Sequence, residues 1–248
     1  MKKIYFVLCV SLFCMLPLSL SAEPFSVRVV TEAGCTAFSN GRYRCQLDNT
    51  LAFNFVHGFI PEIKNSLIKT DYGERLSFQP GFIFLIGRYT YVETLFGPSI
   101  DAENEYVWDG YSEIVTETSK MIISACFRAG FSPSENIFFC VPNTSFLYRF
   151  MPFYSAKLKY YFGYSSDDFL SHTLSSENIF TFQKNTFAGL LSGRIQDTAG
   201  VAAYAWSAGV RYERRVLTDM VLKCTAEYIS EPQDIWGING TCTVDVKF

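Results

Sequence analysis

Two histidines are the side chains of this sequence best suited to proton transfer, and their neighbours do not complete a catalytic site. A serine hydrolase needs a serine beside such a base, and His-x-Ser would be the spacing to find. His172 is followed by Thr173 and Leu174, with Ser175 one position too late, and His57 has no nearby serine. No Cys-x-x-Cys or His-x-His spacing offers a metal site. We therefore predict no enzyme activity and no cofactor, with His172 in a loop and His57 at a strand end or an interface.

All cysteines except Cys9 and Cys14 fall in three consecutive pairs, each centred on a predicted turn. The turn signals are Asn40-Gly41, which favours a hairpin, and the stretches 132–136 and 231–234. In an exported chain, such pairs predict disulfides. The expected bonds join Cys35 with Cys45, Cys126 with Cys140, and Cys224 with Cys242. The alternative is that these cysteines are unpaired, small apolar side chains.

The N-terminus has the features of a secretory signal peptide over residues 1–22. Two lysines precede an apolar run over 4–20, which Pro17 interrupts and small residues end before Ala22. A positive end, an apolar middle and a small residue at the cleavage point are typical of such signals. We expect cleavage after Ala22, leaving 23–248 as a single domain. An uncleaved membrane anchor is the alternative.

Composition narrows the classes of protein that remain. The chain is 49% hydrophobic and 17% aromatic with a net charge of −3, so it is neither disordered nor a basic nucleic-acid binder. Beyond the signal, no apolar run reaches the roughly eighteen residues of a membrane helix. The aromatic content nevertheless suits a membrane interface. Only helices and closed barrels satisfy their backbone hydrogen bonds in lipid, so we expect a β-barrel in an outer membrane.

Period-two alternation is strongest at the C-terminus. Gly240, Cys242, Val244, Val246 and Phe248 fall on one face, and the polar residues between them fall on the other. Such alternation predicts a strand with one apolar and one polar side. Further strands are predicted within 51–55, 76–86, 121–131, 156–164, 187–191, 204–213 and 222–228.

The polar faces of these strands carry charges, and a barrel must turn them inward because its outer face meets lipid. The predicted lumen charges are Lys157, Lys159, Arg128, Arg211, Glu213, Lys223, Glu227 and Asp245. Tyrosine and tryptophan on the apolar faces are expected at the lipid headgroups. A sheet with one face in water would alternate in the same way, so a secreted, disulfide-linked β-sandwich is the alternative fold.

The strand number is predicted from the length of the chain. A spanning strand needs about 9–11 residues. We therefore predict an all-β, antiparallel up-and-down transmembrane β-barrel of eight strands, with ten as the alternative. The residues left over form long loops at 61–74, 98–117 and 165–182. The last of these falls on the periplasmic side, where turns should be short, which conflicts with the count. Pro80, inside a predicted strand, marks a bulge or an edge.

The last part of the chain has a recognisable pattern. It runs from Tyr204 to Tyr212, through a Leu-Thr-Asp turn at 217–219, to Glu227-Tyr228 and the terminal Phe248. Residues 200–248 thereby resemble small Gram-negative outer-membrane barrels, the OmpA-type and opacity-type families. The resemblance implies a barrel in contact with outer-membrane lipid, with Phe248 read by the barrel-insertion machinery. It names no ligand, and no nucleic-acid partner is expected.

Several functions remain open at this point. The favoured one is a non-enzymatic surface role, in which long loops support envelope integrity or bind a host or surface ligand. A small porin is the alternative; lumen lysines would then favour anions, although eight strands usually leave a filled interior. A barrel-embedded lipid hydrolase lacks its His-x-Ser, and a secreted sandwich does not explain the terminal aromatic residue.

Overall fold

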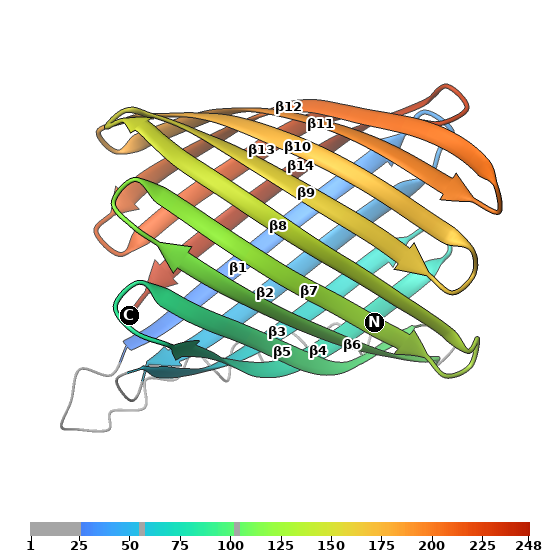
Figure 1. The fold of residues 1–248 in the computed structure, drawn as a ribbon, viewed down its shortest axis with the longest axis horizontal. Helices are drawn as coiled ribbons and strands as arrows, with labels where there is room; N and C mark the ends of the chain where they lie inside the picture. Colours follow the sequence, from blue (N-terminus) through green and yellow to red (C-terminus); the bar gives the residue numbers. More distant parts are fainter. Residues whose placement is uncertain (1–25, 55–57, 102–104) are drawn as a thin grey trace.

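The chain folds into one closed antiparallel barrel of fourteen strands (Figure 1). The computed structural model describes residues 26–54, 58–101 and 105–248, so the predicted signal peptide over 1–22 and His57 lie outside the described residues. Within those ranges, no helix is long and apolar enough to cross a membrane. The strands are β1 (Ser26–Phe38), β2 (Tyr43–Asn54), β3 (Phe59–Thr70), β4 (Gly73–Leu85), β5 (Thr90–Asp101), β6 (Tyr106–Glu117), β7 (Met121–Ser132), β8 (Ile137–Met151), β9 (Tyr154–Ser165), β10 (Phe169–Phe182), β11 (Asn185–Thr198), β12 (Val201–Leu217), β13 (Met220–Glu231) and β14 (Ile235–Lys247).

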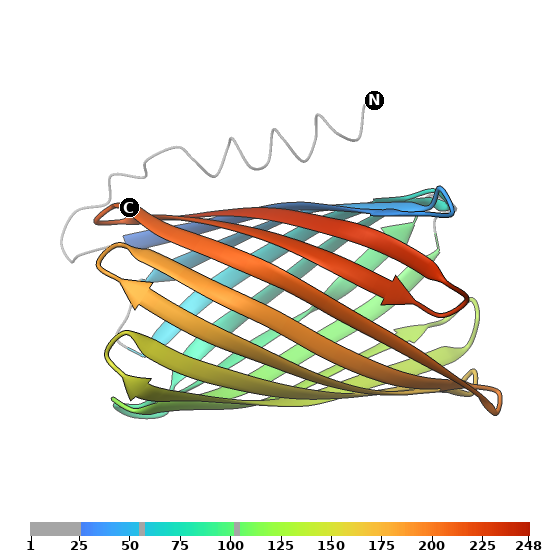
Figure 2. The same cartoon turned by 90° about the horizontal axis from the view of Figure 1, so that it is seen from above.

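The sheet has the simplest topology that a barrel can have. Each strand pairs with the strands before and after it in sequence, and β1 pairs with β14 to close the ring. The ladder continues at the seam, where the Phe248 N–H donates to the Val27 carbonyl oxygen at 2.7 Å. Figure 2 shows the strands running obliquely across the barrel from one end to the other.

The predicted strand number of eight, and its alternative of ten, are wrong. All eight predicted strands are present, as β2, β4, β7, β9 and β11 to β14, but six more lie between them. The stretches predicted as long loops belong instead to β3, β5, β6 and β10, and the intervals between strands are two to four residues. The conflict over 165–182 is thereby resolved, because 169–182 is a strand.

The missed strands alternate poorly because their outer faces carry polar residues. On β10, Leu174 faces outward and is 58% exposed, but His172 and Ser176 share its face. On β3, Asn65 lies on the same outer face as Leu67. A polar residue on the apolar side, or an apolar residue on the polar side, weakens the period-two signal that identifies a strand from sequence.

Strand length agrees with a membrane span. A strand of 13 residues, such as β1, measures roughly 43 Å at about 3.3 Å per residue. Tilted by about 45°, it covers about 30 Å along the membrane normal, which is the thickness of the hydrocarbon layer. Strands of this length can therefore cross a membrane and be joined by tight turns.

Most of the large apolar side chains lie on the outside of the barrel. Among the described residues, no large side chain is fully buried, whereas Phe96, Trp108, Phe127 and Val210 are 42 to 65% exposed. A secreted sandwich would bury such residues between two packed sheets. The closed single sheet therefore excludes the sandwich alternative, and the outer face has the apolar surface that lipid requires.

The predicted turn at Asn40-Gly41 is present between β1 and β2. Gly41 has a φ of 83°, and the Asn40 side chain accepts a hydrogen bond from the Arg42 N–H at 3.2 Å.

The pairing of β4 with β5 is interrupted around Pro80. This residue lies in a central strand, not at an edge, and the hydrogen-bonded ladder between the two strands skips residues 78–80. Gly97 faces that gap, where a Cβ would come 2.0 Å from the Phe78 carbonyl oxygen.

Candidate functional site

Every predicted lumen charge lies on the face of the sheet that turns into the barrel. Directly paired residues of adjacent antiparallel strands share a face, so the registers carry the assignment around the ring. Starting from Asp109, which lines an interior cavity, the pairings place all eight residues on the same side. These are Lys157, Lys159, Arg128, Arg211, Glu213, Lys223, Glu227 and Asp245.

One wall of the lumen is acidic. Every inward-facing charged residue of β5 and β6 is a carboxylate: Glu93, Asp101, Asp109, Glu113 and Glu117. The Arg128 Nε lies 3.1 Å from both carboxylate oxygens of Asp109, and Arg149 donates to Glu117 at 2.8 Å. The sequence did not predict these five carboxylates, because β6 and the end of β5 fall in the predicted loop 98–117 and no strand was predicted around Glu93.

A basic cluster lies on β9, β10 and β12, which Figure 1 shows on the upper side of the barrel while β5 and β6 form its lower side. The Arg211 Nη2 is 3.0 Å from the Glu177 Oε2, and the Lys159 Nζ is 3.9 Å from its Oε1. Lys157 is the direct partner of Glu177 in the β9–β10 register. Three cations therefore surround one carboxylate, which the sequence reasoning did not identify.

The remaining predicted charges lie near the closing seam. Asp245 accepts two hydrogen bonds from Arg28 on β1. Glu227 accepts hydrogen bonds from the Ser207 hydroxyl at 3.1 Å and from Asn239 at 3.5 Å. The last two, Glu213 and Lys223, face each other across β12 and β13. The polar residues in this region are thus held largely by partners within the wall.

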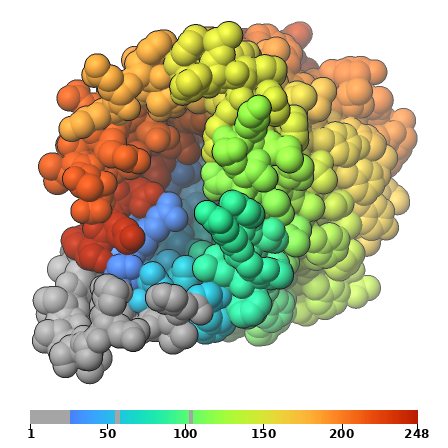
Figure 3. Space-filling model, turned by 60° about the vertical axis from the view of Figure 1, so that its left-hand side comes forward, coloured from blue at the N-terminus to red at the C-terminus, as the bar shows by residue number. Residues whose placement is uncertain are grey.

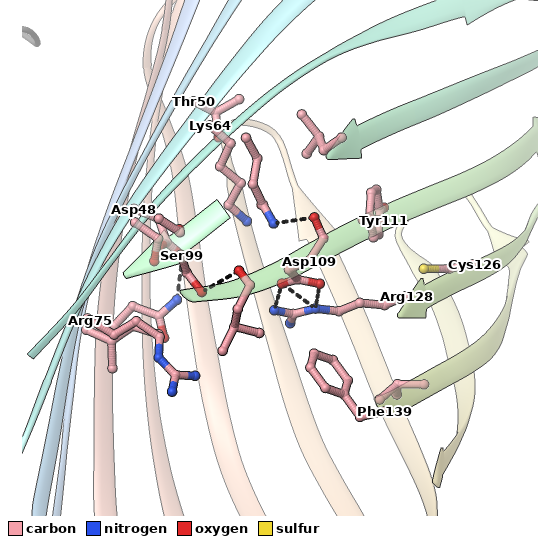
Figure 4. Close-up of a pocket in the computed structure, with 18 of the residues that line it drawn as sticks. Asp48, Thr50, Lys64, Arg75, Ser99, Asp109, Tyr111, Cys126, Arg128 and Phe139 are labelled. Atoms are coloured by element: carbon pink, nitrogen blue, oxygen red, sulfur yellow. Dashed lines mark hydrogen bonds and ion pairs between the residues drawn. The ribbon is translucent and has the colours of Figure 1, made fainter. Parts of the chain in front are cut away.

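Three hollows follow one another through the interior. The first, of about 500 Å³, lies at the end of the barrel where β3 turns into β4. It shares Arg44, Ile68 and Arg75 with a central cavity of about 480 Å³. Figure 4 shows Arg128 meeting Asp109 in this central cavity.

The third hollow, of about 430 Å³, opens at the end that holds Ser26 and Lys247. Figure 3 brings this end forward and shows the molecule hollowed between the N-terminal strands and those coloured green and orange. Arg28 and Ile60 line this hollow, and Glu62, the next inward residue of β3, lines the central cavity. The central cavity is therefore accompanied by a hollow toward each end of the barrel, and charged and polar side chains line all three.

The cysteines divide into three cases. Cys35 and Cys45 face each other across the β1–β2 hairpin and are disulfide-bonded, with their Cα atoms 4.1 Å apart. Cys224 and Cys242 are direct partners on β13 and β14, with sulfur atoms 2.7 Å apart and no disulfide.

The predicted bond between Cys126 and Cys140 is wrong. Cys126 pairs with Asn143 and Cys140 pairs with Ala129, so the register separates the two cysteines along the hairpin. Cys140 lies three residues from Asn143 on β8, and this odd offset turns one thiol into the lumen and the other to the outer face. Cys126 lines the central cavity.

The predicted loop position of His172 is also wrong. This residue lies in β10 on the outer face, where its Nδ1 is 2.7 Å from the Tyr160 hydroxyl and its ring is 5.3 Å from that of Phe162. The described contacts of His172 are with aromatic rings and a hydroxyl group on the lipid-facing side. These contacts give the imidazole a packing role in the outer face.

The fold is shared with known outer-membrane barrels, although their sequences are very different. No protein-family model and no curated protein matches this chain. The CymD monoaromatic hydrocarbon channel matches with a TM-score of 0.65 at 7% identity, over 92% of this chain and 88% of the other. A bacterial polysaccharide outer membrane secretin matches with a TM-score of 0.66 at 9% identity, over 90% and 98%.

A third structure, the KdgM porin in complex with disordered oligogalacturonate, matches with a TM-score of 0.51 at 12% identity, over 90% and 99% of the two chains. These likenesses are likenesses of fold. Together with the closed sheet and its apolar exterior, they show that the chain is an outer-membrane β-barrel, as the sequence predicted.

Proposed function

We propose that this barrel is a channel for small water-soluble solutes across the outer membrane. The observation that carries the proposal is the central polar cavity of the lumen, with a further hollow toward each end of the barrel. Fourteen strands enclose a wider interior than the filled lumen of an eight-stranded barrel. The similar CymD and KdgM structures, described as a channel and a porin, support this proposal.

The distribution of charge suggests how such a channel would treat its solutes. An acidic wall on β5 and β6 faces a basic cluster on β9, β10 and β12. A polar solute with a dipole would be oriented between these walls as it passes. The preference for anions expected from the lysines is reduced, because Glu177 lies among Lys157, Lys159 and Arg211. We therefore propose weak ion selectivity and no catalytic activity.

The surface role has less support than the channel. It depended on long loops that would carry recognition, and the intervals between strands are two to four residues. A role for Phe248 in insertion by the barrel-insertion machinery, and the finer OmpA-type and opacity-type resemblance, stay predictions. The Phe248 side chain is 70% exposed beside β1.

Planar-bilayer recording of the detergent-folded protein tests the proposal. A channel should give stepwise conductance. Ser77 lines the central cavity, so Ser77→Trp should reduce each step, whereas Ser112→Trp on the outer face should leave it unchanged. Absence of conductance from protein whose boiled and unboiled samples differ in gel mobility, and which is therefore folded, would refute the channel.

A further inference from the structure

Three inward carboxylates on β3, β5 and β6 lack the cationic partners found elsewhere in the lumen. They are Glu62, Glu93 and Glu113. In the described part of the chain, Asp109, Glu117, Glu177, Glu231 and Asp245 each form an ion pair, and none of these three does. Other inward carboxylates, such as Glu213 and Glu227, form no ion pair with the described residues either. Glu62, Glu93 and Glu113 differ from them in lying together within strands β3 to β6, and we call these three the acidic cluster.

The strand registers bring the acidic cluster together. Glu93 and Glu113 are direct partners on β5 and β6. Like charges in this position repel and destabilise a sheet. Glu62 lies on the far side of β4, where its direct partner is Gly81, which has no side chain. Glu93 is within electrostatic reach of both other carboxylates.

Glu62 is the clearest sign of a missing partner. Its residue is only 6% exposed, and its Oε2 is buried without a hydrogen-bond partner in the structure. A buried carboxylate oxygen with no partner costs free energy unless a ligand or a cation reaches it. Glu113 accepts a hydrogen bond from the Tyr111 hydroxyl, which is uncharged and leaves the carboxylate charge uncompensated.

The cations near the acidic cluster do not balance it. Lys64, two residues from Glu62, lines the same cavity and is the one basic side chain of β3 that faces inward there. Arg28 is also within electrostatic reach of Glu62, but it already holds Asp245 with two hydrogen bonds. Arg44, Arg75 and Arg128 line the same cavity, but the cations that act most on Glu62 and Glu93 are Lys64 and Arg28. Beside the three carboxylates there is thus one uncommitted ammonium group.

The chemistry of the site indicates the class of ligand. The described residues include no group of carboxylates, thiols or imidazoles placed to hold a metal ion. Glu62 and Glu93 instead line a cavity of about 480 Å³ together with the rings of Tyr111 and Tyr161. Carboxylates that accept N–H donors, beside aromatic faces, suit an alkylammonium group.

We infer that the acidic cluster binds the primary ammonium group of a small organic cation within the lumen. The inference rests on the proposed function only in requiring that solutes enter the lumen. Glu62 and Glu93 would accept its N–H groups, with Glu113 adding negative charge from behind Glu93.

Calorimetric titration with putrescine tests the inference on the full barrel, folded in a zwitterionic detergent at low ionic strength. We expect saturable binding that Glu62→Gln and Glu93→Gln each weaken by about tenfold, since each removes a charge-assisted contact. Glu227→Gln is the matched control, because Glu227 lies four strands from β3 across the seam and its described partners are Ser207 and Asn239. This variant should bind putrescine as the unmodified protein does.

The outcomes separate this inference from the proposed channel. Absence of saturable binding, or equal loss in all three variants, overturns the ammonium site. Sodium or potassium ions that displace putrescine at equal charge concentration would also overturn it, because the site would then be a general cation site. Conductance without putrescine binding leaves the channel intact, and putrescine binding without conductance refutes the channel alone. Boiled and unboiled gel mobility shows that each variant is folded.

Discussion

Arg28 and Asp245 join the first strand of the barrel to the last through two parallel hydrogen bonds. The Arg28 Nε donates to the Asp245 Oδ1 at 3.0 Å, and its Nη2 donates to Oδ2 at 2.7 Å. The two residues are 217 positions apart in sequence, so their contact forms only when the ring closes. Such bidentate pairs are the more specific form of ion pair. This pair therefore contributes to the seam that makes a sheet into a barrel.

We predict that Asp245→Asn destabilises the barrel by about 1 kcal/mol, the range of a partly exposed ion pair. The side chains of Arg28 and Asp245 are 58% and 28% exposed, so water screens part of their attraction. Urea unfolding followed by tryptophan fluorescence measures the change. In a double-mutant cycle, Arg28→Gln should add little to Asp245→Asn. Fully additive losses would show that the two side chains are not coupled.

The cysteine positions predict a specific disulfide map. Oxidation should join Cys224 with Cys242, because they are direct partners whose sulfur atoms are 2.7 Å apart. One disulfide would then join β1 to β2 on one side of the seam, and the other would join β13 to β14 on the opposite side. Mass spectrometry of unreduced peptides checks the map. A peptide joining Cys126 to another cysteine would contradict the register, which turns Cys126 into the lumen.

The strands that the sequence predicted are those whose two faces differ cleanly. On β14, Cys242, Val244 and Val246 face outward, while Thr243 and Asp245 face inward. Apolar residues alternate with polar residues along the whole strand, so the sequence alone shows a period of two. On β6, by contrast, Val107 and Val115 lie on the inward face. Local patterning could not separate the two faces there, so the strand number was underestimated.

Clean alternation along a strand also decided which lumen residues the sequence predicted. Lys157 and Arg211 were assigned to the lumen because their strands alternate well, but their shared partner Glu177 lay in a stretch assigned to a loop. The acidic cluster was missed for a related reason. Glu62 and Glu93 come together only through the neighbour relations of β3, β4 and β5, which depend on the strand number. A contact between strands cannot be predicted until the strands themselves are counted.

Adjacent leucines on β11 test which face of the sheet meets lipid. Leu191 is 58% exposed on the outer face, and Leu190 is the inward partner of Glu177. Leu191→Lys should destabilise the barrel by about 2–4 kcal/mol, as a charge facing the bilayer midplane does. Leu190→Lys should cost much less, because its ammonium lies in the polar lumen beside a carboxylate. Unfolding in urea from lipid vesicles measures both variants, and equal losses would contradict the assignment of the two faces.

Glu177 should control the ion selectivity of the proposed channel. Its carboxylate lies 3.0 Å from Arg211 and 3.9 Å from Lys159, so Glu177→Gln leaves three neighbouring cations without their anion. We expect the variant to conduct chloride better relative to potassium, because uncompensated positive charge in a pore attracts anions. The reversal potential in a potassium chloride gradient should move toward the chloride equilibrium potential. Glu177→Asp keeps the charge and should keep the selectivity of the unmodified protein. An unchanged reversal potential in Glu177→Gln would show that permeating ions do not pass this cluster.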